Sequence, residues 1–221
     1  MANGRLSEAA TRCARAGHPG TLRPRMDWMA DRGEDDAELV RRARAGDSAA
    51  WEKLVERLGG RVWAVARAQG LSRADADDVF QVTWMRLVTH LDSIREPQRV
   101  GAWLAVTARH ESFRVLRRNG RQVPTGDDED FEDGLQLDPP VDASVLANER
   151  QKAVWSAIAT LPSHCQRLLR LLMADPPFSY EQIAELLDIR PGSIGPTRGR
   201  CLDKLRHRLA AFDDETQRTT P

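Results

Sequence analysis

A cluster of basic side chains near the carboxyl end is the strongest chemical signal in the sequence. Between residues 190 and 208 six basic residues stand against a single acid, Asp203: Arg190, Arg198, Arg200, Lys204, Arg206 and Arg208. An arginine fork matches phosphate oxygens and the paired acceptors of guanine in the major groove of DNA. The cluster therefore predicts a helix that binds nucleic acid, and an ordinary solvated basic face is the alternative.

Two short helices must position this cluster. Ser179 and Gln182 form a capping-box pattern that begins the first helix, and residues 188–190 form a tight turn after it. An arginine-rich helix follows the turn and contains most of the basic cluster. Two helices joined by so short a turn, the second of them basic, are typical of a helix-turn-helix that binds DNA.

Position along the second helix assigns roles to its side chains. Residues near the start of a recognition helix usually contact bases, and later residues contact the backbone. Ser193, Thr197 and Arg198 are therefore candidates for base edges. Arg200 and Lys204 are candidates for phosphate contacts.

Pro196 conflicts with a helix that begins at Pro191. A proline inside a helix removes a backbone hydrogen bond and costs about 3 kcal/mol. The conflict eases if Ser193 is the N-cap, because Pro196 then falls where the N–H has no helical partner. We therefore expect a late or distorted start to this helix.

A second basic cluster ends a helix in the first half of the chain. Its basic side chains face only Glu111, and Trp103, His110 and Phe113 lie among them. Such a mixture suits a partly opened strand, because rings stack on unpaired bases, while Trp103 as a plain core residue is the alternative. The basic candidates are Arg109, Arg114, Arg117, Arg118 and Arg121.

A third candidate is an acidic, aromatic helix that begins near Ser72. Asp75 complements the positive end of the helix dipole, so a purely structural role suffices for it. The remaining polar and aromatic residues are candidates for a protein-binding face: Asp77, Asp78, Gln81 and Trp84.

The elements that hold these clusters all follow helical spacing, and no segment alternates like a strand. Further helix caps are expected at Asp47, Ser72, Asp142 and Ser163. The chain of 221 residues has no net charge, yet residues 127–149 carry nine acids and no base. We therefore expect an all-α protein of two small helical domains joined by a flexible acidic linker. The predicted parts are an extension at 1–33, a domain at 34–122, the linker at 123–144, a domain at 145–212 and a tail at 213–221, both ends disordered.

Several classes of protein are excluded by what the sequence lacks. No apolar stretch is long enough for a membrane span, and the first residues lack the apolar core of an export signal. The three scattered cysteines predict neither a disulfide scaffold nor a paired metal site, and His164 and Cys165 should point in different directions. Without a glycine-rich phosphate loop or an HExxH or CxxC motif, we expect no enzyme, no metal and no cofactor.

Five strings of residues carry a further signal: DADDVFQVTWMRLV at 75–88, GAWLAVTAR at 101–109, ATLP at 159–162, SYEQIAELL at 179–187 and RCLDKLR at 200–206. In these strings both helical regions resemble the bacterial extracytoplasmic-function sigma factors of the sigma-70 family. The resemblance covers about residues 35–121 and 145–210, and it is specific because both regions occur in this order around this linker. Val82 departs from the family, which usually has an acid there, and Gly195-Pro196 departs from its usual recognition helix.

The resemblance implies a subunit that binds the β and β′ subunits of core RNA polymerase and recognises promoter DNA in the cytoplasm. Asp77, Asp78, Gln81 and Trp84 would face the polymerase clamp. The loop at 92–97 with Arg95, and the helix after it, would read and open the −10 element. The helix with Arg198 and Arg200 would hold the −35 element. An anti-sigma protein is a further partner that the family implies, and a membrane is not.

The function of the protein and the role of its linker each have an alternative. For the protein, the alternative to a sigma factor is a free-standing helix-turn-helix regulator. An enzyme on nucleic acid would need a metal or nucleophile cluster, which the sequence does not show. The linker is either a solvated tether or an anionic strand in the basic RNA channel of the polymerase, its carboxylates replacing phosphates.

Overall fold

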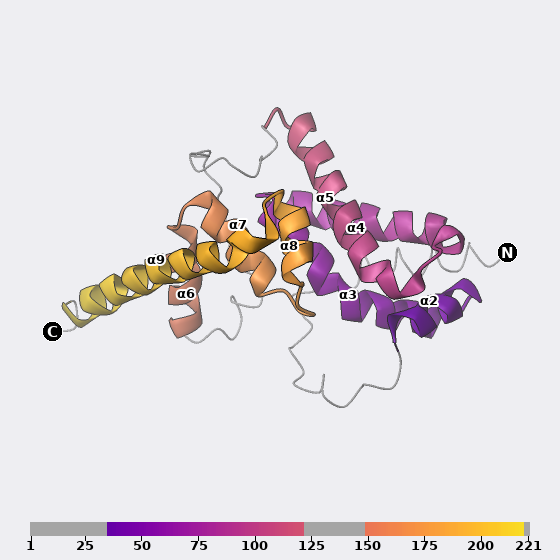
Figure 1. Ribbon diagram of the computed structural model, residues 1–221, viewed down its shortest axis with the longest axis horizontal. Helices are drawn as coiled ribbons and strands as arrows, with labels where there is room; N and C mark the ends of the chain where they lie inside the picture. The colour runs from indigo at the N-terminus through magenta and orange to yellow at the C-terminus, as the bar shows by residue number, and fades with distance from the viewer. Residues whose placement is uncertain (1–34, 122–148, 219–221) are drawn as a thin grey trace.

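The computed structural model describes residues 35–121 and 149–218, and all regular elements within them are helices (Figure 1). This confirms the all-α prediction for the described residues. The N-terminal block comprises α2 (Asp36–Arg44), α3 (Ser48–Ala68), α4 (Arg73–His90), the short 3-10 helices η3 (Leu91–Ser93) and η4 (Pro97–Arg99), and α5 (Val100–Arg118). The C-terminal block comprises α6 (Glu149–Ala159), α7 (Ser163–Leu172), α8 (Tyr180–Leu187) and α9 (Pro191–Arg218).

Side-chain caps fix where three of these helices begin. The Asp47 carboxylate accepts the backbone N–H groups of Ala49 and Ala50 at the start of α3. The Ser72 hydroxyl accepts the N–H of Asp75 in α4, and Ser179 with Gln182 makes the reciprocal capping box of α8. All three caps were predicted from the sequence, because each depends on residues only a few positions apart.

Two helix boundaries differ from the prediction, and three predicted features lie beyond what the structure describes. The N-cap of α7 is Pro162, whose carbonyl accepts the N–H groups of Cys165 and Gln166, and not Ser163. Helix α9 continues to Arg218, because no glycine or proline lies between Gly199 and Arg218 to end it earlier. The predicted extension at 1–33, the linker at 123–144 and a helix cap at Asp142 lie outside the described residues.

Tryptophan packing holds the N-terminal block together. The Trp51 ring on α3 meets the Trp84 ring of α4 edge to face, with 5.6 Å between the ring centroids, and Phe80 lies 6.0 Å from Trp84. Trp51 is fully buried and Trp84 is only 3% exposed. Such pairs add about 0.5–1.5 kcal/mol to the gain from burial. No helix in the described residues has the length and hydrophobicity to cross a bilayer.

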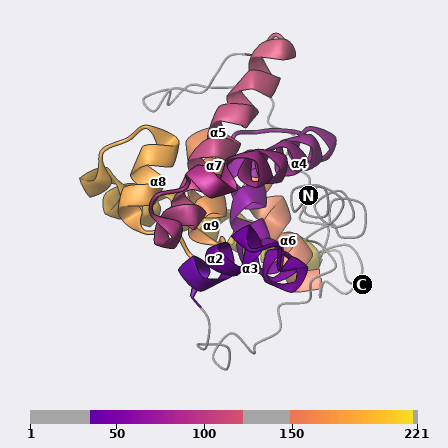
Figure 2. The same ribbon diagram turned by 90° about the vertical axis from the view of Figure 1, so that its right-hand side faces the viewer.

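The two blocks pack directly on each other through α3 and α7, which the sequence did not predict (Figures 1 and 2). The Arg61 guanidinium of α3 donates to the Gln182 amide oxygen of α8 at 2.7 Å and lies 4.2 Å from the centroid of the Phe178 ring. Burial lowers the pKa of Arg61, although an arginine stays protonated in a protein. Gln69 adds a second contact, because its amide oxygen accepts from Arg167 at 3.4 Å.

The close approach of the blocks depends on Gly60. A Cβ atom at this position would lie 2.6 Å from the carbonyl oxygen of Asp175 in the segment between α7 and α8. Gly59 faces Phe80 instead, within the N-terminal block. Helix α3 runs through both glycines, so the pair serves close packing and does not end the helix.

One disulfide bond joins Cys165 of α7 to Cys201 of α9, a pairing that the three scattered cysteines did not predict. The two residues are 36 positions apart, and their Cα atoms lie 5.3 Å from each other. His164 Nε2 lies 3.3 Å from Cys165 Sγ, so these neighbours do meet. Sequence spacing could not show this pairing, because it follows from the packing of α7 against α9.

The Ser179 cap gives a first testable result. We expect Ser179→Ala to lower the free energy of unfolding by about 1 kcal/mol, because the N–H of Gln182 loses its acceptor. Chemical denaturation measures this change. Ser193→Ala is the control, because the Ser193 hydroxyl donates to the Arg190 carbonyl and accepts no backbone N–H in the structure. Equal stability of Ser179→Ala and the unaltered chain would contradict the capping argument.

Candidate functional site

The basic helix α9 begins at Pro191, so of the two expected outcomes, a late or a distorted start, the late start with Ser193 as N-cap is wrong. Ser193 lies within the first turn, where both its N–H and its hydroxyl donate to the Arg190 carbonyl. Pro196 therefore lies inside the helix, exposed to solvent. Proline suits the first position of a helix because its ring fixes φ, and this favours Pro191 as the start. Pro196 then costs one backbone bond to Gly192, in the second turn only.

The outer face of α9 carries the predicted basic residues. Arg198, Arg200 and Lys204 are exposed, while Ser193 and Thr197 are half-buried. Ile194 and Cys201 are fully buried and point the opposite way, which fixes the orientation of the face. Arg206 is paired with Asp203 at 2.5 Å, so part of its charge is already neutralised.

Tyr180 joins this face, although the sequence analysis did not select it. It is the first residue of α8, it is 37% exposed, and its hydroxyl accepts from Arg198 Nη1 at 3.2 Å. The turn between the helices includes Asp188 in the left-handed conformation, with φ of 59°, and Ile189 donates back to Ala184. The signal for Tyr180 was its place directly after the cap of the helix that precedes the turn.

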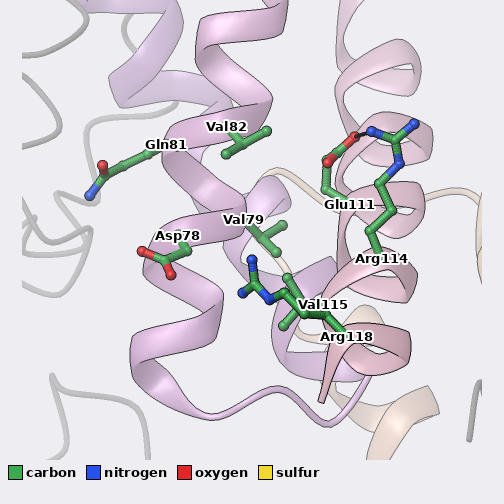
Figure 3. Close-up of a pocket in the computed structure, with 8 residues that line it drawn as sticks. All are labelled: Asp78, Val79, Gln81, Val82, Glu111, Arg114, Val115 and Arg118. Atoms are coloured by element: carbon green, nitrogen blue, oxygen red, sulfur yellow. Dashed lines mark ion pairs between the residues drawn. The ribbon is translucent and has the colours of Figure 1, made fainter. Parts of the chain in front are cut away.

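A groove between α4 and α5 brings two predicted sites together (Figure 3). Its volume is about 350 Å³, and the side chains of Val79, Val115 and Arg118 meet between the two helices. Buried Glu111 links the helices through an ion pair, because its Oε1 lies 2.9 Å from Nε of Arg86 on α4, and it lies 3.6 Å from Nη1 of Arg114 on its own helix. In the sequence Glu111 stood out only as the single acid among the basic residues of this helix. In the structure it links α4 to α5.

Helix α4 presents an exposed stripe with mixed chemistry, which we call the α4 stripe. Asp78 and Gln81 are exposed, as predicted, and Asp77 is half-buried. Val82 is 42% exposed and Met85 is 39% exposed, and all four exposed residues follow helical spacing. Sequence reasoning missed Met85, although exposed apolar residues at this spacing are a common sign of a protein interface.

Trp84 is a correction to the predicted protein-binding face. It is buried against Trp51 and Phe80, so its ring is not available to a partner. The reason is its register: Phe80, Leu87 and Val88 lie on the same side of α4 and form the core. Trp84 supports the α4 stripe from beneath.

The basic candidates of α5 lie on its surface, mostly toward its C-terminal end. Trp103 is half-buried with its ring 6.2 Å from that of His90, and Phe113 is 8% exposed beneath the Arg109 guanidinium. Arg95 is exposed in a loop that Arg44 holds by donating to the Leu91 and Ile94 carbonyls. The other exposed residues are His110, Arg114, Arg117, Arg118 and Arg121.

The geometry thus describes an all-helical protein with two exposed basic helices and a separate mixed stripe, a combination typical of proteins that bind nucleic acid together with a protein partner. The Sigma-70 region 2 family matches residues 54–122, which include α4 and α5. Together with the relatives described next, this match supports an extracytoplasmic-function (ECF) sigma factor of the sigma-70 family.

Named relatives agree with this assignment. The chain is 28% identical over 167 residues to the ECF RNA polymerase sigma-E factor of Escherichia coli K12, covering 72% of this chain and 86% of the relative. It is 26% identical over 194 residues to the ECF RNA polymerase sigma factor SigE of Mycolicibacterium smegmatis, covering 86% of this chain and 74% of the relative.

A solved structure has a similar fold. The structure of CnrH in complex with the cytosolic domain of CnrY matches with a TM-score of 0.52 and 24% sequence identity. The match covers 80% of this chain and 99% of the matched chain. At this identity the likeness supports the fold alone.

Proposed function

We propose that the chain is a promoter-specificity subunit that binds core RNA polymerase and directs transcription initiation at −35 and −10 elements. The observation that carries the proposal is the match of Sigma-70 region 2 to residues 54–122, the part of the chain that contains both the α4 stripe and the basic face of α5. In this role the chain contributes binding and positioning, and the polymerase supplies the catalytic residues.

The α8–turn–α9 unit is the proposed helix-turn-helix for the −35 element. Exposed Arg198 sits near the start of α9, where a recognition helix meets base edges, and Arg200 and Lys204 follow where the backbone passes. Half-buried Ser193 and Thr197 remain base-edge candidates. Tyr180 extends the face onto α8, the helix that crosses the DNA backbone in this motif.

The α4–α5 groove separates two proposed contacts in the N-terminal block. On α4, Asp78, Gln81, Val82 and Met85 form the surface for the polymerase clamp, with Asp77 at its edge. On α5 the exposed arginines contact the −10 region, and the half-buried Trp103 is the ring that could stack on an unpaired base. The shared groove means that polymerase and DNA would bind to adjacent helices.

Other partners follow from the same role. Transcription places the protein in the cytoplasm, and the acidic linker at 123–144 would enter the basic RNA channel of the polymerase. CnrH is recorded with the cytosolic domain of CnrY, and we extend this to an anti-sigma partner for the present chain.

In vitro transcription with purified core polymerase tests the proposal. We expect specific starts only when both the chain and the core enzyme are present, and weak binding to promoter duplex by the chain alone. A footprint on a defined operator without polymerase, together with no stimulated transcription, would support the free-standing regulator instead.

The α4 stripe gives a separable prediction. We expect Met85→Glu to weaken core-polymerase binding by about 10-fold or more, because it places a charge in the apolar part of a buried interface. Met173→Glu is the matched control, since Met173 is also an exposed methionine, at 48%, but belongs to the C-terminal block. Binding is measured by surface plasmon resonance with immobilised core enzyme. Equal affinities of both variants would reject this surface.

A further inference from the structure

The disulfide bond joins the proposed recognition helix to the helix that supports it. Cys165 lies on α7 and Cys201 on α9, and both residues are fully buried. Their Cα separation of 5.3 Å lies within the range that disulfides require, so the bond can form without backbone movement. Among the α9 residues whose side chains are described, only Ile194 and Cys201 are buried. The sulfur bond therefore lies at one of the two most buried positions of α9, and the partly buried Leu202 and Leu205 pack against the core beside it.

The cysteine at this anchor is next to a residue of the DNA-facing surface. Exposed Arg200 directly precedes Cys201, and its guanidinium donates to the Thr197 hydroxyl at 3.1 Å. A covalent bond at Cys201 fixes the helix at the position from which Arg200 projects. Without the bond, packing alone holds this part of α9.

A histidine provides a proton acceptor for the pair. His164 Nε2 lies 3.3 Å from Cys165 Sγ, and the His164 side chain is half-buried while both cysteines are fully buried. A thiol must lose its proton before it attacks an oxidant or a disulfide, because the thiolate is the nucleophile. The imidazole can take this proton from Cys165 and pass it toward solvent.

We propose that Cys165 and Cys201 form a reversible thiol–disulfide pair that regulates how firmly α9 is held for DNA binding. The inference rests on the proposed function, which places the chain in the cytoplasm. Disulfides are rare in that compartment, and those that form there are usually transient and redox-sensing. A pair already positioned for bonding at a recognition helix fits such a role better than that of a permanent staple.

The oxidant is a peroxide, and the reaction balances as follows. The Cys165 thiolate attacks the peroxide, the O–O bond breaks, and Cys165 becomes a sulfenic acid while an alcohol or water leaves with the proton. The Cys201 sulfur then attacks the sulfenic sulfur, the S–S bond forms, and water leaves. The two thiols lose two electrons and the peroxide gains them. A dithiol reductant reverses the change by thiol–disulfide exchange.

The first test counts thiols in the full chain with Cys13→Ala, so that the remaining cysteines are Cys165 and Cys201. We expect hydrogen peroxide to remove both thiols within one molecule and dithiothreitol to restore them. Oxidation should raise the Tm of the chain by roughly 10 °C, because the bond closes a loop in the unfolded chain. The additional change Cys201→Ala should abolish this shift.

His164→Asn tests the chemistry even if the cysteine variant does not fold. We expect peroxide to form the disulfide several-fold more slowly, with the same Tm for the oxidised form, because the asparagine cannot take the thiol proton. A purely structural histidine would change the Tm and leave the rate alone. An unchanged rate of oxidation in His164→Asn would overturn the proposal. So would two thiols that resist peroxide, or a disulfide in the folded chain that resists dithiothreitol.

Zinc distinguishes the main competing explanation. The ligand atoms of His164, Cys165 and Cys201 lie within 4.8 Å of one another, and this set of one nitrogen and two sulfurs suits Zn²⁺. Stoichiometric Zn²⁺ uptake by the reduced chain, with protection of both thiols from peroxide, would replace the redox pair with a metal site. No uptake, with thiols that still oxidise, supports the redox pair.

Transcription separates failure of this inference from failure of the proposed function. With core polymerase present, we expect the oxidised and reduced chains to differ several-fold in binding to duplex that contains the −35 element. A pair that cycles normally in a chain that never stimulates transcription would reject the proposed function. Normal transcription that is identical in both redox states would reject the regulatory inference alone.

Discussion

The double variant Arg198→Ala, Arg200→Ala is expected to bind core polymerase normally and to lose −35-dependent transcription. Both side chains are exposed on the outer face of α9, so their removal leaves the core around Ile194 and Cys201 intact. A bidentate arginine contact to a base contributes about 1–3 kcal/mol, and charge-assisted phosphate contacts are of similar size. Two such losses lower affinity for the −35 element by about 30-fold or more.

Arg206→Ala is the matched control for this experiment. Arg206 lies on the same helix and is equally an exposed arginine, but it is paired with Asp203. We expect its loss to weaken DNA binding by less than either single variant. Electrophoretic mobility shifts with assembled holoenzyme, on promoters with and without the −35 element, measure the difference. An unchanged choice between these promoters by the double variant would remove α9 from the −35 contact.

The two arginines are expected to respond differently to salt and sequence. If Arg198 reads a base, Arg198→Ala relaxes the preference at one position of the −35 element, whereas loss of a phosphate contact by Arg200→Ala weakens binding to all sequences. Tyr180→Phe should reproduce part of the Arg198→Ala effect, because the tyrosine hydroxyl accepts from Arg198. Its magnitude should be smaller, because only one neutral hydrogen bond is lost.

Local signals in the sequence were sufficient for much of the fold. The caps at Asp47, Ser72 and Ser179 were predictable because a capping side chain meets an N–H only two or three residues away. The turn after α8 was predictable for the same reason. Contacts between distant residues left no such signal, so neither the Cys165–Cys201 bond nor the packing of Arg61 on Phe178 could be predicted.

The candidate sites show the same difference between features visible along the sequence and features that depend on packing. The basic residues of α9 were found because charge segregation is visible along the chain, and most of them are exposed. Trp84 was assigned to the surface because a motif contains it, whereas its register buries it against Trp51. Met85 and Tyr180 were missed because an apolar or aromatic residue is informative only once its exposure is known. The late start predicted from Pro196 was wrong because a helix as long as α9 tolerates the loss of one backbone hydrogen bond.

Separation of the two blocks is the expected result of Gly60→Ala. The added Cβ would lie 2.6 Å from the Asp175 carbonyl oxygen, and backbone atoms cannot yield as the end of a side chain can. Movement of this segment carries away Phe178 and Gln182, the two residues that hold the Arg61 guanidinium. Small-angle X-ray scattering should then show a larger radius of gyration, and calorimetry should show two unfolding transitions in place of one.

The matched control for Gly60→Ala is the same substitution at Gly199, where an added Cβ meets no atom within 4 Å. Alanine favours a helix over glycine by about 1 kcal/mol, so Gly199→Ala should stabilise α9 and leave the radius of gyration unchanged. Arg61→Met provides a second route to the same interface, since it removes the hydrogen bond to Gln182 while keeping an apolar stem against Phe178. We expect Arg61→Met to weaken the contact between the two blocks without introducing a steric clash. If both interface variants kept the original radius and a single transition, the contact between α3 and the α7–α8 region would not be what holds the blocks together.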